Sequence, residues 1–171
     1  MKNIFCLFLL ILGTTAFAQV GEDIKIDWPK GWKIDADQEN EKMRMIETLP
    51  KKDDINNWTI LGTEITVKGI PNAGPEIIMN MTFKETAAKA PKAVLTEIAR
   101  DDKAIYPWII YKIESPEYPG SVGTESQLYY AVQGKQNAYS VFVALKEKEL
   151  PKDFVEKWTA IFKAAQIVAR K

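Results

Sequence analysis

Residues 128–145, with the sequence LYYAVQGKQNAYSVFVAL, contain the pattern that decides the fold. Apolar side chains occupy alternate positions on both sides of the Gly134-Lys135 pair, namely Leu128, Tyr130, Val132, Tyr139, Val141, Val143 and Leu145. A period of two is typical of strands that bury one face, and a short polar segment with glycine favours a turn between them. The stretch therefore predicts a β-hairpin in an antiparallel sheet.

Shorter alternating segments surround this hairpin and predict further strands. We expect strands at residues 24–28, 32–34, 43–49, 58–67 and 77–83, and Pro50 is expected to end the third of them. Residues 35–41 are polar and predict a loop. Residues 104–113 are apolar at consecutive positions, which is typical of a strand that is covered on both faces.

Two segments near prolines favour helices. A proline in a helix interior costs about 3 kcal/mol, but the first turn tolerates it. A helix is therefore predicted to begin near Pro91 and to bury Val94, Leu95 and Ile98. A second helix is predicted to begin at Pro151, with an apolar face made of Phe154, Trp158, Ile161, Phe162 and Ala165. Strands with helices on their faces predict a single-domain α+β protein with a largely antiparallel sheet.

Residues 1–18 have the organisation of a secretory signal peptide, because Lys2 precedes an apolar run at 4–12 that is followed by Ala16-Phe17-Ala18. The run has about nine residues, whereas a membrane-spanning helix needs about 20, so cleavage after Ala18 is favoured over a retained anchor. We expect a periplasmic or secreted mature domain, residues 19–171, with no integral membrane segment. Cleavage would also remove Cys6, the only cysteine.

The composition excludes several common chemistries. The chain has 23 Lys and Arg, 23 Asp and Glu, and no His. Without imidazole there is no Ser-His-Asp triad, no Cys-His pair and no His-ligated zinc. The balanced charge argues against a nucleic-acid partner, because phosphate binding depends on clustered Lys and Arg. Glycine-rich phosphate loops are missing, so no cofactor is expected.

Acidic residues alternate at Asp35, Asp37, Glu39 and Glu41, but they do not predict a calcium site. In an EF-hand register, Asn40 would replace the turn glycine and Ile46 the bidentate glutamate. A solvated acidic loop is favoured, and no metal site is predicted. Paired carboxylates could hydrolyse glycosides, but the sequence identifies no pair and no catalytic residue.

Three aromatic residues are candidates for contact with a partner: Trp28, Trp32 and Tyr129. The two tryptophans flank the turn Pro29-Lys30-Gly31, where they could form a binding tip or a packed plug, and the plug is favoured. Tyr129 alternates away from the Leu128 face, which leaves both a buried and an outward position open for it.

The order of these elements, the Trp28-Pro29-Lys30-Gly31-Trp32 segment, the tyrosine-rich hairpin and the closing helix with Trp158 resemble the PsbP-like α/β/α sandwich proteins. The segments Glu47-Thr48-Leu49-Pro50, Asn57-Trp58-Thr59 and Gly123-Thr124-Glu125 resemble small uncharacterised secreted bacterial proteins. This resemblance implies a fold and a compartment, and it implies no catalytic residue and no photosystem partner.

The sequence therefore favours an exported, non-enzymatic binding or accessory module of the bacterial cell envelope, whose partner is another protein or an envelope component. The alternative is a small cofactor-free hydrolase that uses carboxylates or a lysine. A cleft with two carboxyl groups about 5 to 9 Å apart and a raised acid pKa would favour the hydrolase. A flat exposed aromatic patch would favour binding.

Overall fold

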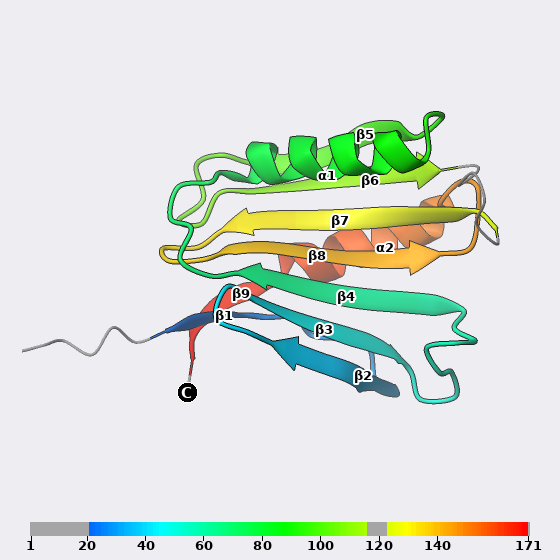
Figure 1. The fold of residues 1–171 in the computed structure, drawn as a ribbon, viewed down its shortest axis with the longest axis horizontal. Helices are drawn as coiled ribbons and strands as arrows, with labels where there is room; N and C mark the ends of the chain where they lie inside the picture. The colour runs from blue at the N-terminus through cyan, green and yellow to red at the C-terminus, as the bar shows by residue number, and fades with distance from the viewer. Residues whose placement is uncertain (1–20, 116–122, 171) are drawn as a thin grey trace, which may run out of the picture.

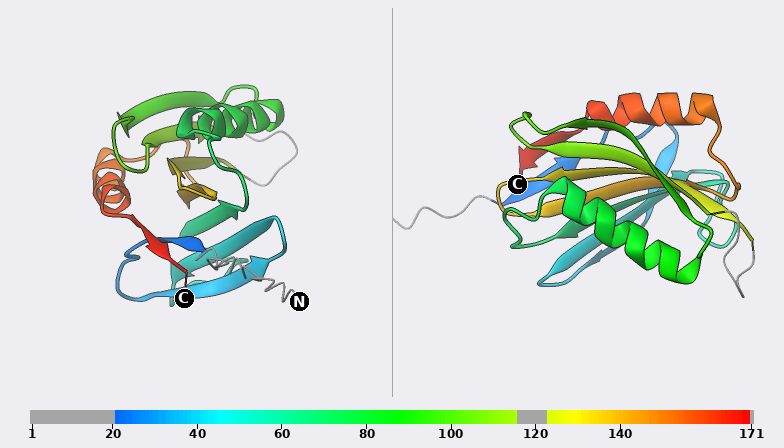
Figure 2. Two further views of the ribbon diagram at one scale, coloured as in Figure 1. Left: turned by 90° about the vertical axis from the view of Figure 1, so that its left-hand side faces the viewer. Right: turned by 90° about the horizontal axis from the view of Figure 1, so that it is seen from above.

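A seven-stranded antiparallel sheet forms the middle layer of the protein, with one helix on each side (Figures 1 and 2). The computed structural model describes residues 21–115 and 123–170, so the predicted signal peptide and its cleavage after Ala18 lie outside the described residues. The elements follow in chain order: β1 (Glu22–Lys25), β2 (Trp32–Glu39), β3 (Met43–Pro50), β4 (Ile60–Val67), α1 (Pro75–Lys89), β5 (Val94–Asp101), β6 (Trp108–Ser115), β7 (Glu125–Gln133), β8 (Ala138–Leu145), α2 (Lys152–Lys163) and β9 (Gln166–Ala169).

The sheet has the strand order β2-β3-β4-β8-β7-β6-β5, and all neighbouring strands are antiparallel. The predicted hairpin is confirmed, since β7 and β8 pair from Gln133 opposite Ala138 to Ser126 opposite Leu145. This hairpin lies in the middle of the sheet, and β1 and β9 form a separate two-stranded ribbon. The chain is thus a single α+β domain, as predicted.

Two hydrophobic cores lie on opposite faces of the sheet. The first core is closed by α2 and the β1-β9 ribbon, and its largest buried side chains include Trp158, Phe162 and Tyr139. The second core lies under α1, which packs on β6 and β7. Strand β6 contributes Ile110 to the first core and Ile109 to the second, which confirms for residues 108–113 the prediction of a strand covered on both faces. Residues 104–107 precede the strand.

The prediction of a strand at residues 77–83 is wrong, because this segment belongs to α1. The alternating residues do not share a face of the helix: Met79 is buried in the second core, whereas Ile77 and Met81 are exposed. Gly74 and Pro75 begin the helix, and the alanines that follow Phe83 extend it to Lys89. The apolar spacing at 77, 78 and 81 is the helical pattern that the period of two obscured.

The helix predicted near Pro91 is also wrong, because residues 94–101 form the edge strand β5. A register shift between Glu97 and Ala99 adds an extra residue to the strand. Leu95 packs in the second core and Ile98 in the first, on opposite faces of the sheet, as residues three positions apart do in a regular strand. The bulge turns Ala99 toward the same core as Ile98, and Val94 is 55% exposed, so the three apolar residues that suggested a helix share no buried face.

The loop predicted at residues 35–41 is in large part a strand, since β2 continues to Glu39 at the other edge of the sheet. Its side chains are mostly exposed, so the burial signal that identifies a strand is missing there. The amphipathic helix after Pro151 is confirmed as α2, which buries Trp158 and Phe162. The short strand β9 that follows it was not predicted. Within the described ranges, no helix is long and apolar enough to cross a membrane.

Candidate functional site

A cavity of about 800 Å³ lies between α1 and strands β4, β7 and β8. Because α1 packs on β6 and β7, no helix of the described residues lies over the neighbouring strands β8, β4 and β3 on this face (Figure 2). On the opposite face, α2, the β1-β9 ribbon and Trp28 and Trp32 pack against the first core. The cavity thus lies beside α1, at the boundary between the part of this face that α1 covers and the part that it leaves uncovered.

Apolar side chains gather at this cavity although they are exposed. Among the described residues, eight large hydrophobic side chains are exposed, and four of these line the cavity: Met43, Ile70, Ile77 and Met81. Ile77 is 54% exposed and Met81 is 59% exposed. Both lie on a side of α1 that adjoins the side packed on the sheet. Helix α1 therefore has one apolar side that packs in the core and a second that faces the cavity.

Aromatic rings form part of the cavity floor. The Tyr129 ring stacks on the Tyr111 ring with centroids 4.8 Å apart and lies 5.0 Å from the Phe142 ring. Tyr129 leaves the Leu128 face, as predicted, but α1 covers the face that it joins, so it is only 5% exposed. The outward position is therefore excluded for Tyr129, which instead lines the cavity.

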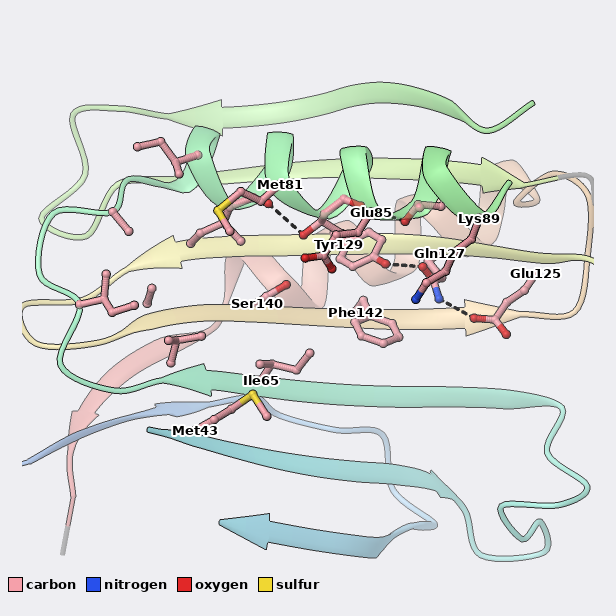
Figure 3. Close-up of a pocket in the computed structure, with 18 of the residues that line it drawn as sticks. Met43, Ile65, Met81, Glu85, Lys89, Glu125, Gln127, Tyr129, Ser140 and Phe142 are labelled. Carbon is pink, nitrogen blue, oxygen red and sulfur yellow. Dashed lines mark hydrogen bonds between the residues drawn. The ribbon is translucent and has the colours of Figure 1, made fainter. Parts of the chain in front are cut away.

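A chain of hydrogen bonds runs along β7 at one end of the cavity (Figure 3). The Tyr129 hydroxyl donates to Oε1 of Gln127, and Nε2 of Gln127 donates to Oε1 of Glu125. Burial raises the pKa of Glu125 above its usual value, and the amide of Gln127 and the charge of Lys146 offset this only in part. The chain ends at a half-buried carboxyl group beside the cavity.

Three further charged side chains line this end of the cavity. Glu85 and Lys89 come from the last turns of α1, and Lys146 follows the end of β8. The Nζ of Lys146 lies 4.3 Å from the centroid of the Trp58 ring, a cation–π contact at the surface. Two amines and two carboxyl groups, counting Glu125, therefore lie around this end of the cavity.

Trp28 and Trp32 lie on the other face of the sheet and do not line the cavity. Their rings stack 5.3 Å apart and meet Trp158 edge-on at 5.6 and 5.3 Å, as a packed plug predicts. The indole Nε1 of Trp28 also donates a 2.6 Å hydrogen bond to Glu64. Gly62 makes room for this ring, because a Cβ there would lie 2.5 Å from it.

The alternating acidic residues of β2 make ion pairs. Asp37 accepts a 2.8 Å bond from Nη2 of Arg44, and Glu39 accepts bonds of 2.8 and 2.7 Å from the two Nη atoms of Arg170. The hydrogen bonds from Arg170 and Lys68 lower the pKa of Glu39 to about 2. In the part of the chain that the structure describes, no three His, Cys, Asp or Glu side chains converge on a common point as a metal would require.

Comparisons with known proteins give the chain no family. No protein-family model and no curated protein matches it. A crystal structure from Bacteroides thetaiotaomicron VPI-5482, at 1.50 Å resolution, is 16% identical over 86% of this chain, with a TM-score of 0.43. This chain covers 45% of that protein, less than half of its length.

Of the three predicted partner-contact residues, only Tyr129 belongs to the cavity. The cavity side of α1 was missed because residues 77–83 were assigned to a strand, and Glu125 and Gln127 of β7 were not singled out. Gln127 and Tyr129 are two residues apart on β7, so the alternation that identified one of them could have identified the other.

Proposed function

We propose that the protein is an exported, non-enzymatic binding module of the bacterial cell envelope that holds an apolar ligand in the cavity between α1 and the sheet. The single observation that carries this proposal is the gathering of four exposed hydrophobic side chains at one cavity. Contiguous exposed apolar surface marks binding sites in soluble proteins. The signal-like residues 1–18 support export.

The dimensions and the walls of the cavity suit a small ligand. Its volume of about 800 Å³ falls within the roughly 300 to 1,000 Å³ of small-molecule sites. The Tyr129 ring forms part of its floor and is held in place by stacking on the buried Tyr111 ring, and a preformed floor lowers the entropy cost of binding. This proposal narrows the expected partner to an envelope component. We also propose that the sandwich is PsbP-like, which the Trp28 to Trp32 segment and α2 support.

Binding of a neutral apolar probe tests the proposal. N-phenyl-1-naphthylamine, which becomes fluorescent in apolar surroundings, should bind the purified protein at one site. Ile77→Gln should weaken this binding about tenfold, because it removes an apolar wall of the cavity. Ile105→Gln is the matched control, since Ile105 is 88% exposed and lies outside this cavity. Failure to bind, or equal weakening by both variants, would contradict the proposal.

A hydrolase is the second candidate, because the raised pKa of Glu125 is the property of a general acid and Glu85 lines the same cavity. We expect no enzyme-dependent release of nitrophenol from 4-nitrophenyl glycosides or esters. Turnover that Glu125→Gln abolishes would instead establish the hydrolase. The same assay on Glu85→Gln would then show whether a second carboxyl group takes part.

A further inference from the structure

The cavity has an apolar end and a polar end, and this arrangement follows from the topology. Strand β7 begins at Glu125 and β8 ends at Leu145, so the start of β7 and the end of β8 lie at the same end of the central hairpin. Helix α1 also ends at this end of the hairpin, where the Lys89 side chain reaches toward Gln127 (Figure 3). Ile70, Ile77 and Ala138 line the opposite end.

Charges at the polar end are balanced. Glu85 and Glu125 contribute two carboxyl groups, and Lys89 and Lys146 contribute two amines. The last carbonyl groups of α1 add partial negative charge, which the neighbouring Lys89 offsets. A ligand group with a full charge of either sign would therefore meet a like charge as well as an opposite one, so the balance favours a neutral group.

The direction of the hydrogen-bond chain selects a donor. Tyr129 donates to Gln127 and Gln127 donates to Glu125, so the last member presents carboxylate oxygens. Within the described residues, Gln127 is the one hydrogen-bond donor to this carboxyl group. A half-buried acceptor with unused capacity is best satisfied by a hydroxyl or amide that donates to it.

We infer that the ligand is a neutral single-chain amphiphile whose apolar chain lies between α1 and β4 and whose hydroxyl-bearing head donates a hydrogen bond to Glu125. This inference rests on the proposed function, because it assigns the ligand class of the same cavity. Met43, Ile65, Ile77 and Met81 contact the chain, and the head lies among Glu125, Gln127 and Lys89.

Competition among three ligands with 12-carbon chains tests the head group. Monododecanoylglycerol, dodecanoate and dodecyltrimethylammonium are used to displace N-phenyl-1-naphthylamine, each below its micelle-forming concentration. We expect monododecanoylglycerol to displace the probe at about a tenth or less of the concentration that the two charged ligands need. A charged ligand that displaces the probe at the same concentration as monododecanoylglycerol, or at a lower one, would overturn the inference.

Variants of Glu125 test the hydrogen bond itself. Glu125→Leu should weaken the binding of monododecanoylglycerol about ten- to hundredfold and leave the affinity for N-phenyl-1-naphthylamine unchanged. Glu147→Leu, which removes an exposed carboxyl group outside the cavity, should change neither. If Glu125→Leu does not fold, the isosteric Glu125→Gln should still cause a severalfold loss. A folded Glu125 variant that binds monododecanoylglycerol as tightly as the wild-type protein would overturn the inference. A wild-type protein that does not bind N-phenyl-1-naphthylamine would instead contradict the proposed function.

Discussion

At the scale of single residues, close packing against a glycine holds the tryptophan plug in place. A Cβ at Gly62 would lie 2.5 Å from two atoms of the Trp28 ring and 2.8 Å from the Thr48 hydroxyl. The Trp28 ring in turn contacts Trp32 and Trp158. The indole ring can therefore lie close against β4 because this strand has no side chain at position 62.

Gly62→Ala should lower the free energy of unfolding by about 1 to 3 kcal/mol, since the added methyl group must displace the ring or the strand. Urea unfolding measured by tryptophan fluorescence would show the change. Gly21→Ala is the control, because a Cβ there would make an ordinary 3.4 Å contact with Arg170. A Gly62→Ala protein as stable as the control would mean that the Trp28 ring does not lie on β4 as described.

At the scale of elements, the sequence predicts those whose pattern is local and misassigns those whose pattern depends on distant packing. Strands β7 and β8 alternate without interruption, and α2 has one apolar face, so both were predicted. Helix α1 has two apolar sides because one of them faces a cavity, and β5 contains a bulge. Neither feature could be recognised before the partner strands were known, and the cavity depends on α1.

One contact between elements ties the start of β1 to the turn of the central hairpin. The Glu22 carboxylate accepts hydrogen bonds of 3.0, 2.8 and 2.8 Å from the backbone N–H groups of Lys135, Gln136 and Asn137. Gly134 is required there, because a Cβ would lie 2.2 Å from this carboxylate. The predicted turn thus depends on a residue more than 100 positions earlier in the chain.

Glu22→Ala should lower the free energy of unfolding by about 1 to 3 kcal/mol, because it leaves three turn N–H groups without their acceptor. Amide hydrogen exchange at residues 135–137 should accelerate in the folded protein. Glu41→Ala, a change at an exposed position, should alter stability by less than about 0.5 kcal/mol. Equal exchange in the wild-type and Glu22→Ala proteins would show that the turn is held by its own backbone alone.

At the scale of the whole molecule, the two faces of the sheet are covered unequally. The face toward α2 is closed by a helix, a ribbon and two tryptophans, whereas α1 covers only part of the other face. The sequence predicted a sheet covered by helices, and it singled out Tyr129, which lines the cavity. It did not predict that the two faces are covered unequally. Each helix has its own apolar pattern, and the position of a helix over the sheet is set by the loops and by side chains that lie far apart in the chain.

Ion pairs join β1 and the residue after β9 to the edge of the sheet and should make stability depend on pH. Glu39 of β2 pairs with Arg170 beyond β9 and with Lys68 beyond β4. Arg44 of β3 joins Asp23 of β1 to Asp37 of β2. The pKa of Glu39 is lowered from 4.5 to about 2, chiefly by the hydrogen bonds from Arg170 and Lys68.

A carboxyl group with a lowered pKa in the folded state stabilises the protein above the unfolded value and loses this effect as the pH falls toward the folded value. Stability should therefore decline between about pH 4.5 and 2, and added salt should reduce the contribution because Glu39 is exposed to solvent. Urea midpoints over this range should fall less steeply for Glu39→Gln than for the wild-type protein. Glu41→Gln, two residues further along the chain, should retain the wild-type slope. Equal slopes for Glu39→Gln and the wild-type protein would show that the contact between Glu39 and Arg170 adds nothing to the stability of the folded chain.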